Sequence, residues 1–219
     1  RARQRRIGAG HLLDVKASGV FVLGIGHGNK LLTDLYHCHL TKVYTVGGLF
    51  GKATDDFSDT GKLIEKTTFD HITREKLERI LAVIQGTNHK ALLMYVSNGE
   101  IQLMGSDCHL LLIKTNQIIF FAIIKVFKQI HCLHETQQYL RKIVHEIGLE
   151  LKSSAVCTQV RRIRDGVFTL EDALLRTQWD LQSIQNAIQN CQLKVKTELE
   201  KTLGQQDRSL LQELEAEMA

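Results

Sequence analysis

The chain has 219 residues, of which 43% are hydrophobic and 24% are charged, and both fractions are typical of a soluble globular protein rather than a disordered one. Its longest apolar stretch, Ile118 to Phe127, is far shorter than the ~20 residues that span a bilayer, so we expect no membrane span. Part of the net charge of +4 lies in arginine clusters at the start of the chain and at residues 161–164. Such clusters favour a phosphate-rich partner over a simple solvated surface.

The first third of the chain divides into short segments that are separated by glycines. The pattern predicts a loop from residue 10, a strand over Val20–Ile25, a helix over Asn29–His37 and a long strand over His39–Phe50. A further helix is expected from Arg74 to Gln85, because apolar residues recur there at helical spacing after a Thr73 cap.

The remaining elements follow in the same way. Four strands are predicted, over Ala91–Val96, Ile101–Met104, Leu110–Ile113 and Ile118–Phe127. A helix over Gln137–Ile147 is expected to stop at Gly148, and a strand over Val156–Ile163 follows it. Thr169 and Asp172 have the spacing of an N-terminal capping box, which predicts a last helix that continues to about Leu199.

Five cysteines without a CxxC pair indicate free thiols in a reducing compartment. The segments His37-Cys38-His39 and His131-Cys132-Leu133-His134 contain side chains that bind zinc, but their spacing matches no standard zinc site, so we expect no metal. The chain starts at Arg1 instead of Met and contains no proline, which indicates a fragment or an unusual gene product. Its arginine-rich start has the composition of the end of a transit peptide.

Asp14 is the strongest candidate for chemistry. It lies in a loop between Gly10 and Gly19, immediately before an apolar segment. A loop at the edge of a rigid sheet can present a reactive carboxylate to a cleft. The alternative interpretation is a turn aspartate that caps its own backbone.

Several motifs accompany Asp14 in a fixed order along the chain. They are Leu13-Asp14 with Ala17-Ser18-Gly19-Val20, Ile25-Gly26 with Lys30, Lys42-Val43-Tyr44, Phe50-Gly51 with Thr54-Asp55-Asp56 and Gly61, Leu140-Arg141 with Gly148, and Val160-Arg161-Arg162 with Gly166 and Phe168. This series resembles the TruB-type pseudouridine synthases over about residues 8–175, and it most resembles their animal mitochondrial branch.

The resemblance implies an α/β (α+β) fold with a mixed, mostly antiparallel sheet that is flanked by helices. It also implies a catalytic domain over residues 1–175, in which the N-terminal strand segment is missing and residues 95–131 depart from the family pattern. Residues 176–219 are expected to form a C-terminal helix and a charged tail, with no PUA domain.

The activity that the resemblance implies is the isomerisation of uridine in RNA, which breaks an N-glycosidic bond, remakes it to carbon and needs no cofactor. Asp14 would be the nucleophile, Arg141 would keep its carboxylate ionised and aimed, and Tyr44 would stack on the extruded uracil. Without the motifs, Tyr44 is a core residue and Arg141 a surface residue. Contacts to RNA are expected from His11, Lys16, Lys30, Lys42, Arg161, Arg162 and Arg164. His11 would correspond to the family histidine that wedges into the RNA stack, and Lys16, Lys30 and the three arginines are otherwise solvated charges.

The resemblance points to two substrates, the T-loop of transfer RNA and mitochondrial messenger RNA, and the sequence does not choose between them. The expected partners are RNA and mitochondrial RNA-processing proteins around a monomer, and the expected compartment is the mitochondrial matrix, with the nucleus and cytoplasm as the alternative. A second hypothesis is an RNA-binding or assembly factor that keeps the fold without turnover. The divergent central segment favours this hypothesis, whereas the presence of Asp14, Tyr44 and Arg141 disfavours it.

Overall fold

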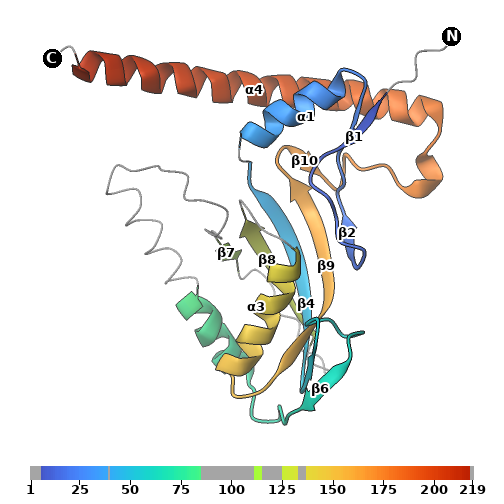
Figure 1. The fold of residues 1–219 in the computed structure, drawn as a ribbon, viewed down its shortest axis with the longest axis vertical. Coiled ribbons are helices and arrows are strands. Elements are labelled where there is room, and N and C mark those ends of the chain that lie inside the picture. Colours follow the sequence, from blue (N-terminus) through green and yellow to red (C-terminus); the bar gives the residue numbers. More distant parts are fainter. Residues whose placement is uncertain (1–5, 39, 85–110, 115–124, 133–136, 218–219) are drawn as a thin grey trace. The chain divides into compact units, whose positions relative to one another are not determined.

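The computed structural model describes residues 6–38, 40–84, 111–114, 125–132 and 137–217, and it confirms the α/β class (Figure 1). The chain divides into two compact units. We call them the sheet unit, made of Leu13–Gly19 and Thr41–Ile163, and the terminal unit, made of Arg1–Leu12, Val20–Leu40 and Arg164–Ala219. None of the described helices is both long enough and apolar enough to cross a bilayer.

A mixed sheet is the framework of the sheet unit. Across it, the described strands follow the order β2 (Ala17–Gly19), β9 (Ala155–Asp165), β4 (Lys42–Phe50), β8 (Lys125–Cys132) and β7 (Leu111–Lys114). The pairs β4–β8 and β8–β7 are antiparallel, whereas the short strand β2 runs parallel to β9. After β4, the strands β5 (Lys52–Thr54) and β6 (Leu63–Lys66) form a small antiparallel pair. The sheet is therefore mixed and mostly antiparallel, as predicted.

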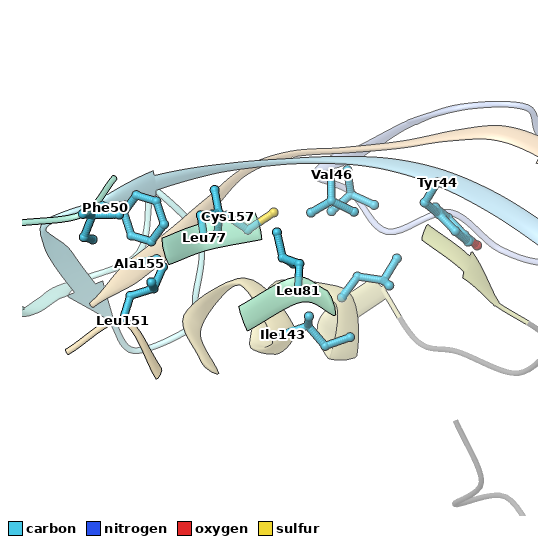
Figure 2. Packing of buried hydrophobic residues seen from close by; sticks show 12 residues of the cluster. Tyr44, Val46, Phe50, Leu77, Leu81, Ile143, Leu151, Ala155 and Cys157 are labelled. Carbon is cyan, nitrogen blue, oxygen red and sulfur yellow. The ribbon is translucent and has the colours of Figure 1, made fainter. Parts of the chain in front are cut away.

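The core of the sheet unit lies between the sheet and two helices, residues 74–84 and α3 (Gln137–Glu150) (Figure 2). Leu77 and Leu81 from the first helix and Leu140 and Ile143 from α3 are buried against β4 and β9. Burial of each large aliphatic side chain contributes roughly 1.5–3 kcal/mol. Gly48 allows the close approach of α3, because a Cβ at this position would lie 2.7 Å from Cγ1 of Val144.

The two helices of this core differ in how well the sequence predicts them. Helix 74–84 begins as expected, since the Thr73 hydroxyl accepts a hydrogen bond of 3.3 Å from the Lys76 N–H. The expected stop of α3 at Gly148 is wrong, because the helix continues to Glu150. Gly148 instead serves close packing, since a Cβ there would lie 2.5 Å from the backbone nitrogen of Ala155.

Lys152 ends α3 in place of Gly148. Its φ of 57° is left-handed, and its N–H donates to the Leu149 carbonyl at 2.9 Å. The Ser153 N–H donates to the Gly148 carbonyl, also at 2.9 Å. This pair of bonds is a Schellman motif, which is usually built on glycine at the position that Lys152 occupies.

Several predicted strands need new bounds. The strand expected over Val20–Ile25 is only β3 (Leu23–Ile25), because this is the part that pairs with β1 (Ile7–Ala9). The long strand begins at Lys42 rather than at His39, and the strand expected to end at Phe127 continues as β8 (Lys125–Cys132). The part of that prediction over residues 118–124 lies outside the described residues. The prediction of β7 is confirmed to within a residue, and β9 is longer than expected. The predictions over Ala91–Val96 and Ile101–Met104 lie outside the described residues.

The terminal unit combines β1, β3, β10 (Phe168–Thr169) and the last residues of β9 with the helices α1 (Gly28–His37), η1 (Arg176–Gln178) and α4 (Leu181–Glu217). The sequence predicts α1 well, but the last helix does not begin at Thr169. Asp172 does accept a hydrogen bond from the Thr169 N–H at 2.9 Å, but this bond closes a turn. The N-cap of α4 is Asp180, which accepts from the Ser183 N–H at 2.9 Å.

Candidate active site

The loop that carries Asp14 is anchored at both the side chain and the backbone. The Arg141 guanidinium, on α3, donates to the Asp14 carboxylate. The Asp14 carbonyl accepts a hydrogen bond of 2.9 Å from the Ala17 N–H, which closes a turn directly before β2. The side chains of Asp14 and Arg141 are 31% and 13% exposed, so the carboxylate remains accessible while the guanidinium is largely enclosed.

The charge of Asp14 follows from this pairing. The hydrogen bond from Arg141 lowers the pKa of the Asp14 carboxyl below its ordinary value, and partial burial acts in the opposite direction without reversing the effect. The positive charge of Arg141 and the N–H of Val15 lower the pKa further. Asp14 is therefore ionised at neutral pH, and it is a carboxylate that can act as a nucleophile rather than as an acid.

Gly19 fixes the other end of the loop. Its φ is +110°, a conformation that favours glycine, and a Cβ at this position would lie 2.0 Å from the Arg162 carbonyl oxygen. This close approach comes from the parallel pairing of β2 with β9, in which Gly19 lies opposite Arg162. The glycine of the Ala17-Ser18-Gly19 motif is therefore required for the strand that holds the loop in place.

A second ion pair joins the same loop to residues 54–62. The Lys16 ammonium donates to Asp56 Oδ2 and to Ser58 Oγ, each at 2.7 Å. Asp56 Oδ1 in turn accepts from the Ser58 N–H at 3.0 Å. The hydrogen bonds from Lys16 and Ser58 hold the pKa of the Asp56 carboxyl well below its ordinary value.

The motif that follows Phe50-Gly51 in the sequence, with Thr54 and Asp55, forms loop 54–62 in the structure. The Asp55 carboxylate accepts from the Lys62 N–H at 2.9 Å, and the Thr54 hydroxyl donates to the Ser58 carbonyl at 2.6 Å. A Cβ at Gly61 would lie 2.1 Å from Asp56 Oδ1, so a side chain there would displace the Asp56 carboxylate. The sequence motif includes Thr54, Asp55 and Asp56 but gives no role to Asp56 or Ser58.

Three of the expected site residues are buried in the sheet unit. Tyr44 is 1% exposed and belongs to the hydrophobic cluster between β4 and the helices, as Figure 2 shows. Lys42 is 4% exposed and Arg162 is 0% exposed. The expectation that Lys42 and Arg162 contact phosphates therefore stays a prediction, and such contacts would require that RNA binding uncover both side chains. Arg161, which alternates with Arg162 along β9, is exposed.

His11 forms part of a small aromatic cluster in the terminal unit. Its ring stacks on Tyr36 of α1, with ring centroids 5.0 Å apart and an interplanar angle of 26°. Its Nδ1 lies 3.4 Å from Oδ1 of the buried Asp165. These rings border a small pocket whose other lining is mainly apolar and includes Leu32 and Phe168. Sequence reasoning found His11 but missed Tyr36 and Asp165.

The remaining basic residues of the terminal unit differ in exposure. Lys30 is exposed on α1, and Arg164 is half-buried on β9. Among the described residues, no group of three or more His, Cys, Asp or Glu side chains is arranged to hold a metal ion. Of the cysteines in these regions, Cys157 is buried, and burial raises the pKa of its thiol to about 11.

Most of the chain is similar to known proteins. Residues 1–142 match the family model of the TruB family pseudouridylate synthase N-terminal domain. Over 212 residues the chain is 56% identical to the mitochondrial pseudouridylate synthase TRUB2 of Homo sapiens, and the match covers 91% of this chain and 63% of that protein. The corresponding protein of Xenopus tropicalis is 58% identical over 200 residues, with 85% of this chain and 61% of that protein covered. The chain thus spans less than two thirds of these relatives.

A solved structure shares the fold at much lower identity. The archaeal box H/ACA Nop10–Cbf5 complex contains a chain that superposes with a TM-score of 0.51 and 20% identity, over 78% of this chain and 42% of that chain. At this identity the likeness shows a common fold and nothing finer.

Proposed function

Because this chain belongs to the TruB family of pseudouridylate synthases, we propose that it isomerises uridine to pseudouridine in RNA, with Asp14 as the nucleophile. The observation that carries the proposal is the ion pair between Asp14 and Arg141. It places an ionised, partly accessible carboxylate on a loop that β2 and α3 hold from two sides. We assign this activity to residues 1–175, which include every side chain of the proposed site.

The chemistry needs a group of this kind. Uridine and pseudouridine are isomers: the N1–C1′ bond breaks, the base turns, a C5–C1′ bond forms, and one proton moves from C5 to N1. Atoms and electrons balance without an oxidant or a reductant. A carboxylate that bonds transiently to the nucleoside divides this exchange into two easier steps, and the lowered pKa of Asp14 keeps it ionised at neutral pH.

The substrate uridine must leave the RNA stack before a side chain on a protein loop can reach it. Arg141 orients the Asp14 carboxylate and keeps it charged during the attack. We assign Tyr44 to stacking on the extruded base and to the final proton transfer. Since its ring is 1% exposed, this role requires that RNA binding uncover it.

Each of the two units carries groups that can bind RNA. Exposed or half-buried positive charges that can contact phosphates are present at Lys30, Arg161 and Arg164. The stacked rings of His11 and Tyr36 offer an aromatic face to an unpaired base. The candidate substrates remain the T-loop of transfer RNA and mitochondrial messenger RNA. The relatives are named mitochondrial, which supports a mitochondrial compartment. Within it we propose the matrix as the location, mitochondrial RNA-processing proteins as partners and a monomer as the working form.

The proposal is tested by incubating the full chain with uridine-containing RNAs, one carrying a T-loop and one a messenger RNA segment, followed by chemical probing for pseudouridine. The parent chain should form product, and Asp14→Asn should form none while it keeps its affinity for RNA. Asp70→Asn is the matched control, because Asp70 is an exposed carboxylate outside the site.

Two results would refute the proposal in different ways. Product formation by Asp14→Asn at the parent rate would remove Asp14 from the mechanism. Tight RNA binding by the parent chain without product on either RNA would favour the second hypothesis, a binding or assembly factor that keeps the synthase fold.

A further inference from the structure

Lys16 lies two residues after Asp14, and its side chain extends from the Asp14 loop to loop 54–62. Its ammonium donates two hydrogen bonds of 2.7 Å, one to Asp56 Oδ2 and one to Ser58 Oγ. Ser58 Oγ itself donates to the Asp56 carboxylate, at 2.8 Å from Oδ1. The three side chains therefore form a closed set of mutual contacts.

The partners of Lys16 are themselves held rigidly. The Asp56 carboxylate caps the Ser58 N–H, and the backbone around Ser58 pairs with β9 through the bridge between Ser58 and Cys157. The Cys157 N–H donates to the Phe57 carbonyl at 2.7 Å, and the Asp59 N–H donates to the Cys157 carbonyl at 3.0 Å. Lys16 thus connects the Asp14 loop to a segment that is fixed on the central part of the sheet unit.

From this geometry we infer that Lys16 is a positioning residue for the nucleophile, and that Asp56 and Ser58 are its anchors. The inference rests on the proposed function of Asp14. Arg141 holds the carboxylate itself, and Lys16 holds the backbone that carries it. The two contacts restrain the loop at points two residues apart, which limits both the translation and the rotation of the Asp14 side chain.

The alternative role of Lys16 is a phosphate contact, and the two roles have different consequences. A phosphate contact supplies binding, so its loss raises KM and reduces the salt dependence of RNA binding. A positioning contact supplies geometry, and a displacement of about 1 Å at a reacting group can cost on the order of 100-fold in rate. An ion pair as exposed as this one, at 44% for Lys16 and 38% for Asp56, contributes little to global stability, so a change in rate would not reflect unfolding.

The test compares Lys16→Met, Lys16→Arg, Asp56→Asn and the Lys16→Met, Asp56→Asn double variant in steady-state kinetics with the full chain. Asp56→Asn is chosen because the amide oxygen can still accept from the Ser58 N–H while the negative charge is lost. We expect kcat to fall on the order of 10-fold in Lys16→Met and in Asp56→Asn, with KM within about twofold of the parent in each. The double variant should be no slower than the single variants, and Lys16→Arg should recover most of the rate.

Lys196→Met is the matched control, since Lys196 is an exposed lysine that pairs with Glu200 on α4, and it should leave both constants unchanged. A rise in KM for Lys16→Met with an unaffected Asp56→Asn variant would overturn the inference in favour of a phosphate contact. Additive losses in the double variant would also overturn it, because they would show that the two residues act independently.

A second measurement does not depend on turnover. Hydrogen exchange of the free protein should show amide exchange at residues 15–17 that is about tenfold faster in Lys16→Met and Asp56→Asn than in the parent, with an unchanged unfolding midpoint. If the parent chain formed no pseudouridine, the proposed function would fail while this result still showed whether Lys16 restrains the loop. Unchanged exchange in both variants would overturn the restraint even in an active enzyme.

Discussion

Arg141 donates a hydrogen bond to Asp14 across 127 residues of sequence. The contact requires that the loop before β2 and the first half of α3 be assembled together in the sheet unit. Since the bonded guanidinium lowers the pKa of the Asp14 carboxyl, this pair determines both the direction of the carboxylate and the pH range in which it is charged.

Arg141→Gln should slow the reaction and move the acidic limb of the pH–rate profile to higher pH. Removal of the guanidinium raises the pKa of Asp14 toward the ordinary carboxyl value, so a larger fraction of the enzyme is protonated at a given acidic pH. The measurement is kcat/KM between pH 4 and pH 8 (about the range over which a carboxyl limb is visible). Arg74→Gln, which breaks only a surface ion pair with Glu78, is the control and should leave the profile in place.

The pair of Asp14 and Arg141 also predicts how the free energy of unfolding changes with pH. Folding lowers the pKa of Asp14, so its contribution to stability is present above the ordinary carboxyl pKa and is lost as the pH falls through the lowered value. The difference in free energy of unfolding between the parent and Arg141→Gln should therefore shrink as the pH falls through the lowered pKa, when urea unfolding of both is followed by circular dichroism at a series of pH values. A difference that stays constant between neutral and acidic pH would contradict this linkage.

Gly19→Ala should destabilise the protein by about 2 kcal/mol or more, because alanine would have to adopt a positive φ and its Cβ would collide with the Arg162 carbonyl. Gly26→Ala separates these two effects. Gly26 has a φ of +62°, but a Cβ at this position would meet no atom within 4 Å, so this variant should lose only about 1 kcal/mol. Urea unfolding measures both, and equal losses would argue against the close approach of β2 to β9.

Tyr36→Ala should weaken RNA binding by about 1–3 kcal/mol if the ring stacked on His11 also contacts a base. His11→Ala should have an effect of similar size, and the double variant should lose less than the sum, because each ring supports the other. Fluorescence anisotropy with labelled RNA measures these affinities. Trp179→Ala removes another exposed aromatic ring of the terminal unit and serves as the control.

Cys157 should react with iodoacetamide at least about tenfold more slowly than Cys38 in the folded protein at pH 8. Burial raises the pKa of the Cys157 thiol to about 11, which leaves little reactive thiolate, and it also blocks the reagent. Cys38 is only partly buried. Mass spectrometry of the labelled peptides follows both rates, and the difference should disappear in concentrated urea.

The sequence predicts elements well where local signals decide them. Helix 74–84 has an apolar face and the Thr73 cap, and both are found. It predicts ends poorly where a tertiary contact decides them. Gly148 has the appearance of a helix stop but is used for the approach of Ala155, and Thr169 with Asp172 has the pattern of a helix start but closes a turn.

The candidate site shows the same division. The motif around Asp14 and the downstream Arg141 could be found from sequence, and the structure brings these two residues together. The anchors of Lys16 lie 40 and 42 residues away, and nothing local identifies them. The burial of Arg162 could not be predicted from the sequence either. Basic residues alternate along a strand in the same way whether the face that carries Arg162 is exposed to water or buried in the protein.

The division of the chain into interleaved units has a practical consequence for anyone who wishes to dissect it. Leu13–Gly19 belongs to the sheet unit, but the segments before and after it in the chain, Arg1–Leu12 and Val20–Leu40, belong to the terminal unit. A recombinant piece that starts at Thr41 and stops at Ile163 would keep Arg141 and most of the sheet but would lose Asp14. To study the sheet unit alone, the Asp14 segment would have to be joined to it again, for example by circular permutation, because no single cut in the polypeptide yields an intact sheet unit.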